Sequence, residues 1–326
     1  MPNHIRQAGL KEARPGGMMN IRHLALAALL SCAGASAGQA QQGGSLLQGA
    51  DPDFEAGDGR YWLYPTGDKA LFAWSSPDMR QWQRGAQLLS LDAIGWIGDD
   101  GAPRHFLWAP DMVAANGRWY LYYSVGPQNP TPSRIGVALC RSLAGPCADS
   151  GKPLIHDGGN RFEAIDPAVF VDPKDGTAYL YAGGSAGARL RAWVLKPDMI
   201  SLDRELQVPT PPRFTEGAFM FERGGTYYLS YSSGKWRESS YSVHYATAAA
   251  PTGPWSYAGA ILVSDAIYKG PGHHAFLRDP TDGRWYIAYH RWEGQRGDGP
   301  YTGQRRIAIQ PVAFAADGAI LPIRME

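Results

Sequence analysis

The sequence predicts an all-β domain built as a five-bladed β-propeller. A short phrase, in which a glycine is followed by aromatic and apolar residues, occurs five times along the chain. Its glycines are Gly59, Gly117, Gly176, Gly225 and Gly283, so successive phrases lie 58, 59, 49 and 58 residues apart. A turn glycine before such residues is typical of the start of a strand, and radial repetition of similar small sheets produces a propeller.

The other segments of each repeat support the same architecture. A second apolar run follows each phrase, at residues 71–74, 135–138, 190–193, 243–246 and 307–309. Three of these runs lead into turns rich in proline, at residues 76–79, 196–199 and 251–255. No long stretch has a helical period. Residues 41–326 are therefore predicted to form a single five-bladed domain.

Composition excludes one class of partner. The chain has 326 residues, of which 31 are Lys or Arg and 30 are Asp or Glu, for a net charge of +1. No basic stripe stands out, so nucleic acid is not expected as a partner. The hydrophobic share of 44% is enough for a large core.

The first forty residues differ from the rest. Arg22 precedes an apolar run at 24–30, and small residues follow at 33–40, which is the layout of a secretory signal peptide. We therefore expect residues 1–40 to be an N-terminal extension and signal peptide that is removed, and the mature protein to be secreted or periplasmic. The run is too short to span a bilayer. A lipid anchor at Cys32 is the alternative, because the preceding residues partly match a lipoprotein cleavage box.

The remaining cysteines, Cys140 and Cys147, lie close together in a loop-like stretch. In an exported protein they would form a disulfide that closes a small loop. The alternative is a pair of free buried thiols. No Cys/His spacing suggests a zinc site.

Polar residues recur at one position of the repeat. Asp51, Asp166, Glu216 and His273 each precede a repeat glycine by eight to ten residues and adjoin an apolar segment. Burial of an unpaired carboxylate is costly, and any one of the acids alone is more simply explained as a turn residue. Ring closure would gather all of them at one axis, so the joint pattern favours catalysis.

At these positions the chain resembles glycoside hydrolase family 43, which contains arabinanases, α-L-arabinofuranosidases and β-xylosidases. The resemblance covers residue 48 to the C-terminus and rests on the motifs at 50–52, 108–111, 165–167, 215–217 and 270–274. It implies an inverting acid/base hydrolysis in which Asp51 is the general base, Asp166 modulates the acid and Glu216 is the general acid. It also implies that His273 points into the central channel, near a structural calcium ion that it would contact through water. No cofactor is implied for the chemistry itself.

The chemistry of glycoside hydrolysis agrees with this assignment. One carboxylic acid protonates the leaving oxygen and one carboxylate activates water. A nearby Asp166 anion would help Glu216 to keep its proton through like-charge repulsion. Because the family usually has a small residue after the first Asp-Pro and this chain has Asp53 there, Asp53 is an alternative base. The motif position favours Asp51.

Aromatic residues would line a sugar-binding funnel. The candidates for sugar contacts are Trp74, Trp108, Phe219, Trp236, His273 and Arg291. The neighbouring His274 is expected to be an ordinary buried histidine. The expected partner is an oligosaccharide or polysaccharide that contains arabinose or xylose, and we expect an exo-acting α-L-arabinofuranosidase or β-xylosidase.

Two other functions have partial support in the sequence. Residues 183–187 match the G-x-S-x-G pattern of serine hydrolases, but that motif needs a following helix and the residues after it alternate like a strand. A non-catalytic propeller that binds glycans would keep the repeats and the aromatic residues. It would have no reason to keep all three carboxylates.

Overall fold

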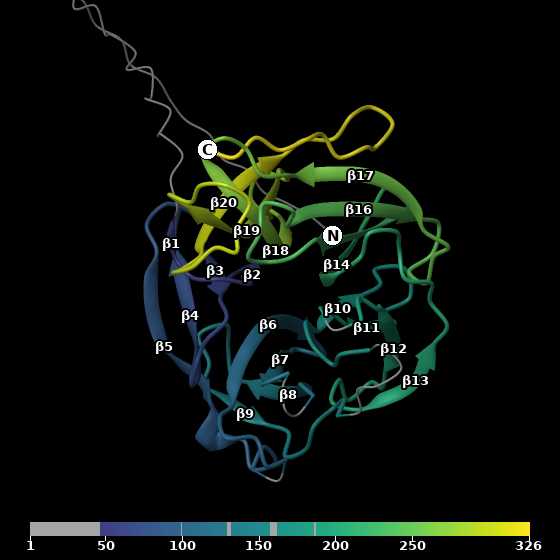
Figure 1. The fold of residues 1–326 in the computed structure, drawn as a ribbon. Helices are drawn as coiled ribbons and strands as arrows, with labels where there is room; N and C mark the ends of the chain where they lie inside the picture. Colours follow the sequence, from purple (N-terminus) through teal and green to yellow (C-terminus); the bar gives the residue numbers. More distant parts are fainter. Residues whose placement is uncertain (1–45, 99, 129–131, 157–161, 186) are drawn as a thin grey trace, which may run out of the picture. The chain divides into compact units, whose positions relative to one another are not determined.

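The computed structural model describes residues 46–98, 100–128, 132–156, 162–185 and 187–326. These residues form five antiparallel sheets of four strands each, which confirms the predicted five-bladed β-propeller. In Figure 1 the sheets follow one another around a common centre. The predicted signal peptide, residues 1–40, and Cys32 lie outside the described residues. In the described part of the chain, no helix is long and apolar enough to cross a membrane.

Each blade is a meander whose innermost strand comes first, except that the last blade borrows its outer strand. Blade 1 contains β2 (Asp53–Gly57), β3 (Arg60–Tyr64), β4 (Ala70–Ser76) and β5 (Gln83–Ser90), followed by the short helix η1 (Leu91–Ala93). Blade 2 contains β6 (Phe106–Ala115), β7 (Arg118–Gly126), β8 (Arg134–Cys140) and β9 (Cys147–Asp149). Blade 3 contains β10 (Ala168–Val171), β11 (Ala178–Ala182), β12 (Arg191–Leu195) and β13 (Leu202–Leu206). Blade 4 contains β14 (Glu216–Arg223), β15 (Thr226–Ser233), β16 (Ser242–Ala248) and β17 (Ser256–Leu262). Blade 5 contains β18 (Tyr268–Arg278), β19 (Trp285–Glu293), β20 (Arg306–Val312) and β1 (Leu47–Gln48).

The ring is closed by a short strand from the other end of the domain. β1 pairs with β20, with Leu47 opposite Ile307 and Gln48 opposite Arg306. Because β1 leads directly into blade 1, this pairing joins the first blade to the last. The five repeated phrases all lie on the second strand of a blade, and the second apolar runs lie on or at the third strand.

The hydrophobic core lies between neighbouring blades. Each of the five core clusters combines residues from two adjacent sheets, so that every seam of the ring has one cluster. For example, Leu71 of blade 1 and Leu121 of blade 2 belong to one cluster and are almost fully buried. Because no blade buries its two faces alone, the blades stabilise one another as repeat units do in other closed arrays.

The last tyrosine of the repeated phrase ties three blades to the next one. The hydroxyl groups donate hydrogen bonds across the seams from Tyr64 to the Leu143 carbonyl, from Tyr122 to the Met199 carbonyl and from Tyr181 to the Pro251 carbonyl, at 2.9, 2.6 and 2.7 Å. A buried hydroxyl needs such a partner. The phrase therefore specifies both a strand and its docking on the neighbouring blade.

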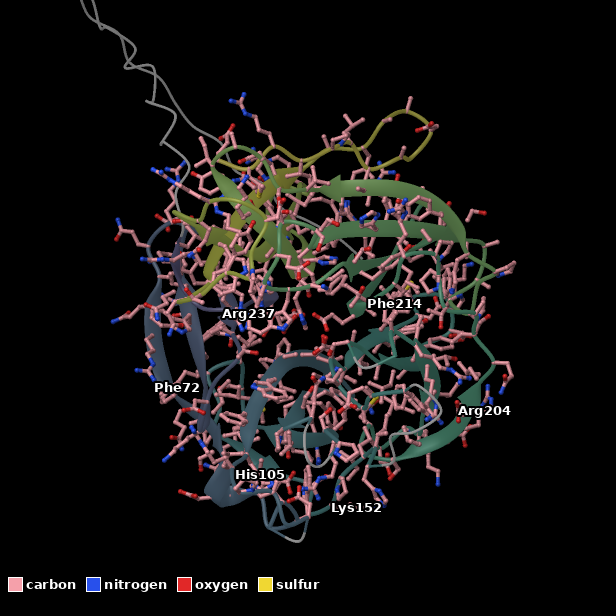
Figure 2. The ribbon with its side chains drawn as sticks, in the orientation of Figure 1. Phe72, His105, Lys152, Arg204, Phe214 and Arg237 are labelled. Carbon is pink, nitrogen blue, oxygen red and sulfur yellow. A yellow bond between two sulfur atoms is a disulfide. The ribbon has the colours of Figure 1, made fainter. Side chains whose placement is uncertain are left out.

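The structure also tests the predictions for the cysteine pair and for residues 183–187. Cys140 and Cys147 form a disulfide between β8 and β9, so the paired alternative is confirmed. The stretch after Gly183 leads into strand β12 and not into a helix, which contradicts a serine-hydrolase elbow. Figure 2 shows Arg237 near the centre of the ring in this view, whereas Phe72, Lys152 and Arg204 lie toward its rim.

Candidate active site

One residue in each blade has a left-handed backbone at the inner end of the sheet. These residues are Asp51, Ala109, Asp166, Gly217 and His273, with φ of 50°, 43°, 56°, 60° and 39°. For a residue other than glycine this conformation costs roughly 1–2 kcal/mol. Its recurrence at equivalent positions indicates that the fold imposes it, and the backbone turn directs the side chains of Asp51, Asp166 and His273 away from the regular strand pattern.

The backbone N–H of each of these residues is bound by a side chain of the preceding blade. Four of the acceptors stand seven residues after a repeat glycine. Ala109 donates to Thr66 Oγ1, Asp166 to Ser124 Oγ, His273 to Ser232 Oγ and Asp51 to His290 Nδ1, at 2.8, 2.9, 2.8 and 3.2 Å. These hydrogen bonds between neighbouring blades therefore stabilise the left-handed backbone at each of these positions.

Blade 3 is the exception, and the exception positions a carboxylate. Its equivalent residue is Gly183, which has no side chain that could accept a hydrogen bond. The N–H of Gly217 donates instead to Asp166 Oδ2 at 3.1 Å. The carboxylate of Asp166 is therefore directed toward blade 4, where Glu216 begins the inner strand. Gly184 allows this close approach, because a Cβ atom there would lie 2.8 Å from Cβ of Glu216.

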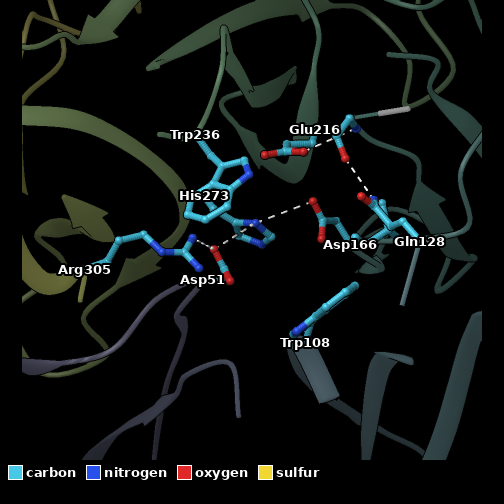
Figure 3. A pocket seen from close by; sticks show the side chains of 10 residues that line it. Asp51, Trp108, Gln128, Asp166, Glu216, Trp236, His273 and Arg305 are labelled. Atoms are coloured by element: carbon cyan, nitrogen blue, oxygen red, sulfur yellow. Dashed lines mark hydrogen bonds and ion pairs between the residues drawn. The ribbon is translucent and has the colours of Figure 1, made fainter. Parts of the chain in front are cut away.

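These side chains meet in one pocket of about 270 Å³ (Figure 3). Its lining comes from all five blades and consists of Asp51, Trp108, Gln128, Ile165, Asp166, Ser185, Glu216, Trp236, His273 and Arg305. Figure 3 shows His273 between Asp51 and Asp166, with dashed lines from it to both carboxylates. Asp51, Asp166 and Glu216, which the sequence predicted to converge, therefore line one pocket.

Asp51 accepts hydrogen bonds from an arginine and a threonine. Arg305 Nη1 donates to its Oδ1 at 2.8 Å, and Thr66 Oγ1 donates to its Oδ2 at 2.8 Å. His290 Nδ1 lies 3.1 Å from Oδ1. Burial favours the neutral acid, but Arg305, His273 and His290 outweigh it and hold the pKa of Asp51 well below its usual 3.8. Asp51 is therefore ionised near neutral pH.

His273 bridges two of the carboxylates. Its Nδ1 lies 3.6 Å from Asp51 Oδ1 and 3.5 Å from Asp166 Oδ2. Burial lowers the pKa of His273 below its usual 6.5, although the charges of Asp51 and Glu216 oppose this shift. A neutral imidazole at this place separates the two acids without adding a charge.

Asp166 and Glu216 form a closely spaced pair. Burial raises the pKa of Asp166 well above 3.8, and the charges of Glu216 and Asp51 raise it further. Glu216 accepts hydrogen bonds from the Tyr241 hydroxyl on Oε1 at 2.7 Å and from the Ser185 N–H on Oε2 at 3.2 Å. Burial and the neighbouring acids therefore raise the pKa of Asp166, whereas the sequence predicted the effect of like-charge repulsion at Glu216.

Asp53 lies outside the lining of this pocket. Its Oδ2 accepts the N–H of Met112 at 2.8 Å, across the seam between blades 1 and 2. Burial raises the pKa of Asp53 to about 7. Because Asp53 does not line the pocket and Asp51 does, the geometry favours Asp51 over Asp53 as the base.

The predicted sugar-contact residues divide into two groups. Trp108, Trp236 and His273 line the pocket, as expected. Trp74, Phe219 and Arg291, which were also expected there, are not part of this lining. Trp74 faces a separate groove beside Phe72 and Arg84.

The other two residues pack away from the pocket. Phe219 packs on His274 and Phe276 between blades 4 and 5. Arg291 is fully buried and donates to Glu293 Oε1 at 3.0 Å and to the Tyr289 hydroxyl at 3.2 Å. Side chains alternate between faces along a strand, so Arg291 points away from the face that His290 shares with Asp51.

Several residues of the site were missed from the sequence. Gln128, Ile165, Ser185 and Arg305 line the pocket, and Thr66, Tyr241 and His290 contact its carboxylates. Thr66 and His290 could have been found from their shared distance to the repeat glycine. Arg305 and Tyr241 lie in loops or at strand starts that carry no such signal.

The expected calcium ion, which His273 would contact through water, stays a prediction. Calcium takes six to eight oxygen ligands. The described residues contain no group of three or more His, Cys, Asp or Glu that could hold a metal ion. Nδ1 of His273 faces carboxylates, and no step is assigned to a metal.

The neighbouring His274 is buried, as expected. Its Nε2 lies 2.7 Å from Ser230 Oγ, and burial lowers its pKa to about 3. Its Nδ1 has no hydrogen-bond partner within the described part of the chain. His274 is therefore a neutral packing residue behind the site.

Comparison with known proteins gives a consistent set of relatives. The sequence model described as "Glycosyl hydrolases family 43" matches residues 46–320. A β-D-galactofuranosidase of Aspergillus niger is 33% identical over 299 residues, which cover 85% of this chain and 82% of the relative. A xylosidase/arabinosidase of Bacteroides ovatus is 27% identical over 330 residues, covering 84% of this chain and 94% of the relative.

Solved structures share the fold. A β-xylosidase/α-arabinofuranosidase from a compost metagenome, in a calcium-free complex with xylotriose, aligns with a TM-score of 0.69 at 27% identity. That alignment covers 85% of this chain and 96% of the other. An α-L-arabinofuranosidase from Clostridium thermocellum aligns with a TM-score of 0.68 at 29% identity, covering 85% of this chain and 94% of the other.

Proposed function

Because the chain belongs to glycosyl hydrolase family 43, we propose that it removes terminal α-L-arabinofuranosyl or β-D-xylosyl units from plant-type oligosaccharides with inversion at the anomeric carbon. The observation that carries this proposal is the meeting of Asp51, Asp166 and Glu216, from three different blades, in one pocket flanked by tryptophans. A glycosidase needs two carboxyl groups with opposite tasks, and this pocket provides distinct surroundings for each.

In the proposed mechanism Asp51 is the general base. The pKa of Asp51 is held low mainly by Arg305 against the effect of burial, so it is ionised and can take a proton from water. The water oxygen forms a bond to the anomeric carbon while the bond to the leaving oxygen breaks on the opposite face. The electron pair of that bond stays on the leaving oxygen, which takes a proton from Glu216.

The two acids then return to their starting states by exchange with solvent, since Asp51 has gained one proton and Glu216 has lost one. We propose that Asp166 assists this proton exchange and that it positions Glu216. Its carboxylate binds the N–H of Gly217, the residue after Glu216, and fixes the backbone that carries the acid. Its own raised pKa makes it a neighbour that can share the proton of the pair.

The sugar is proposed from the relatives. Curated relatives named xylosidase/arabinosidase match most of this chain. The relative from A. niger, named β-D-galactofuranosidase, makes a galactofuranosyl unit the alternative glycone. The pocket is small, near the lower end of the range for ligand sites, and we propose that it takes one terminal sugar unit in exo fashion.

A place outside the cytoplasm is also proposed. The arrangement of charge, apolar run and small residues in residues 1–40 supports export. The disulfide between Cys140 and Cys147 supports an oxidising compartment. Cell fractionation with N-terminal sequencing of the mature protein tests this. A full-length protein in the cytoplasm would refute it.

Hydrolysis is tested with para-nitrophenyl α-L-arabinofuranoside, β-D-xyloside and β-D-galactofuranoside, with the product anomer followed by NMR. We expect turnover of at least one substrate, with the first product of opposite anomeric configuration. Glu216→Gln should abolish turnover of a natural oligosaccharide and leave sugar binding measurable by calorimetry. If wild type binds sugars and hydrolyses none of them, the protein is a glycan-binding propeller. Retention of configuration would refute the roles given to the two acids.

A further inference from the structure

A groove on blade 1 is separate from the catalytic pocket. Its volume is about 520 Å³, and its lining has no residue in common with that of the pocket. The lining comes from the end of β1, from the loop at 65–69 between β3 and β4, and from strands β4 and β5. Trp74, which the sequence predicted to contact a sugar, lines this groove.

The loop at 65–69 forms a fixed wall of the blade 1 groove. Four hydrogen bonds tie it to its neighbours, from the N–H groups of Thr66, Gly67, Leu107 and Leu91 to the carbonyl groups of Ala50, Leu107, Asp68 and Lys69, at 2.9, 2.9, 3.1 and 3.0 Å. Gly67 is required in this loop, because a Cβ atom there would lie 2.0 Å from the Ala70 carbonyl oxygen. The groove is therefore formed before a ligand binds, which lowers the entropic cost of binding.

Two aromatic side chains of β4 lie in the groove. Phe72 and Trp74 are both partly exposed, whereas Leu71 and Ala73 beside them are buried, as strand alternation requires. Trp74 also packs against the core cluster between blades 1 and 5, which supports its indole ring. Phe72 belongs to none of the core clusters of the described residues and lies toward the rim of the ring in Figure 2. Core packing therefore does not account for the phenylalanine.

Polar side chains surround these two rings. Arg84 stands opposite Trp74 in the pairing of β4 with β5, and its guanidinium lies 3.7 Å from the centre of the Phe72 ring. Four exposed side chains that line the groove have no hydrogen bond or ion pair within the described part of the chain: those of Gln48, Asp68, Lys69 and Arg84. Together they offer donors and acceptors to a ligand.

These features fit a sugar chain. The apolar face of a sugar ring can lie on an aromatic side chain, and its hydroxyl groups both donate and accept hydrogen bonds. Two cations and one acid in the lining produce no strong field of either sign, which favours a neutral ligand. The groove is nearly twice as large as the pocket of about 270 Å³ for which we propose one sugar unit, so it has room for about two units.

We propose that the blade 1 groove is a second, non-catalytic carbohydrate-binding site, which holds about two neutral sugar units of a polysaccharide on Phe72 and Trp74. The class of ligand rests on the proposed function, whereas the site lies outside the catalytic pocket. Thr66 lines the groove and donates a hydrogen bond to Asp51, so the two sites are neighbours. A polymer held at the groove would stay at a high local concentration near the pocket.

Binding is tested by affinity electrophoresis in gels that contain soluble arabinoxylan, with every variant made in a Glu216→Gln background so that the polymer is not cut. We expect Phe72→Ala and Trp74→Ala each to weaken binding by about threefold to tenfold, and Lys69→Ala by about twofold. Arg223→Ala is the matched control for Arg84→Ala, because its guanidinium likewise lies over a phenylalanine, at 4.2 Å from the Phe314 ring. Arg84→Ala should weaken binding and Arg223→Ala should not.

Kinetics on two substrates separate the groove from the pocket. With Glu216 restored, Phe72→Ala should raise KM on arabinoxylan by about threefold or more and leave kcat/KM on the aryl glycosides unchanged, since an aryl glycoside is too short to reach both sites. Equal losses on both substrates for Phe72→Ala and Lys69→Ala would overturn the assignment of a separate site.

Unchanged binding of arabinoxylan by Phe72→Ala and Lys69→Ala, or no binding by the Glu216→Gln parent, would also overturn the groove site while the proposed function stands on the aryl glycosides. Binding that depends on the groove in a wild-type protein without any hydrolysis would overturn the proposed function and support the groove site. Because Trp74 packs on the core and Phe72 and Lys69 do not, the last two variants decide the test if Trp74→Ala fails to fold by circular dichroism.

Discussion

Replacement of Asp53 by asparagine should make the protein more stable at neutral and mildly alkaline pH. Asp53 is 4% exposed, and its Oδ2 accepts the N–H of Met112 between two blades. Asparagine has nearly the same shape, and its amide oxygen can accept the same hydrogen bond. The substitution therefore removes a charge and leaves the contact in place.

The magnitude follows from the pKa of Asp53, which burial raises from its usual 3.8 to about 7. Below the lower value both folded and unfolded chains hold the proton. As the pH rises from the pKa of the unfolded chain toward that of the folded protein, the unfolded chain releases its proton first. Stability that is present in acid is therefore lost as the pH approaches the pKa of Asp53 in the folded protein. About three pH units at 1.36 kcal/mol each give an upper bound of about 4 kcal/mol. Glu55 and Asp111, whose pKa values are raised by burial and by Asp53, would add to the gain in the same direction.

The assay is urea unfolding followed by tryptophan fluorescence, for wild type and Asp53→Asn, at about pH 4.5 and about pH 8. We expect similar free energies of unfolding in acid and a variant that is more stable by up to about 4 kcal/mol at the higher pH. Activity on the aryl glycoside panel should persist, because Asp53 does not line the pocket. A variant that is less stable at both pH values would refute the buried-charge argument. Loss of turnover in a stable Asp53→Asn protein would transfer the role of base from Asp51 to Asp53.

Three further outcomes follow from the site and its surroundings. Arg305→Gln removes the main cation that lowers the pKa of Asp51. The acidic limb of the kcat/KM profile should therefore move to higher pH by about one unit or more. An acidic limb that does not move would show that Asp51 is not the titrating base. Tyr241→Phe removes the hydroxyl that donates a hydrogen bond to Glu216. We expect kcat to fall by about tenfold to a hundredfold, which corresponds to roughly 1.5–3 kcal/mol for a hydrogen bond to a charged group. Circular dichroism should show that the fold is retained. Cys140→Ser with Cys147→Ser opens a loop with a sequence separation of 7 and should lower the free energy of unfolding by about 2 kcal/mol in chemical denaturation; an unchanged midpoint would contradict the loop-closure argument.

The repeat made the fold predictable. A glycine turn followed by a strand that docks through its last tyrosine is a local pattern, and its spacing alone gives five blades. The three acids could be singled out for the same reason, because equivalent positions of equivalent units must share one axis. Asp51 and Asp166 occupy the same left-handed position in their blades, and Glu216 stands one residue before it.

The sugar-contact predictions were less successful because they depended on side-chain direction. Trp74 and Phe219 are aromatic residues on strands, as Trp108 is, and residue type does not separate them. A bulge between Trp108 and Asp111 turns Trp108 into the pocket, whereas Phe219 follows the bulge of its own strand and returns to the seam between blades. Arg291 differs from His290 by one step of the strand alternation and is therefore enclosed in the sheet.

The sequence by itself determined the number of blades, the strand that bears each phrase and the three acids that belong together, because these depend on periodicity along the chain. The tertiary structure alone decided which partners those acids have. Arg305 reaches Asp51 from the last blade, and Tyr241 reaches Glu216 from the residue before β16 in the same blade. Arg305 contributes to the low pKa of Asp51, and Tyr241 holds the carboxyl group of Glu216 in place. Electrostatic surroundings depend on distances through space, which no spacing along the chain encodes.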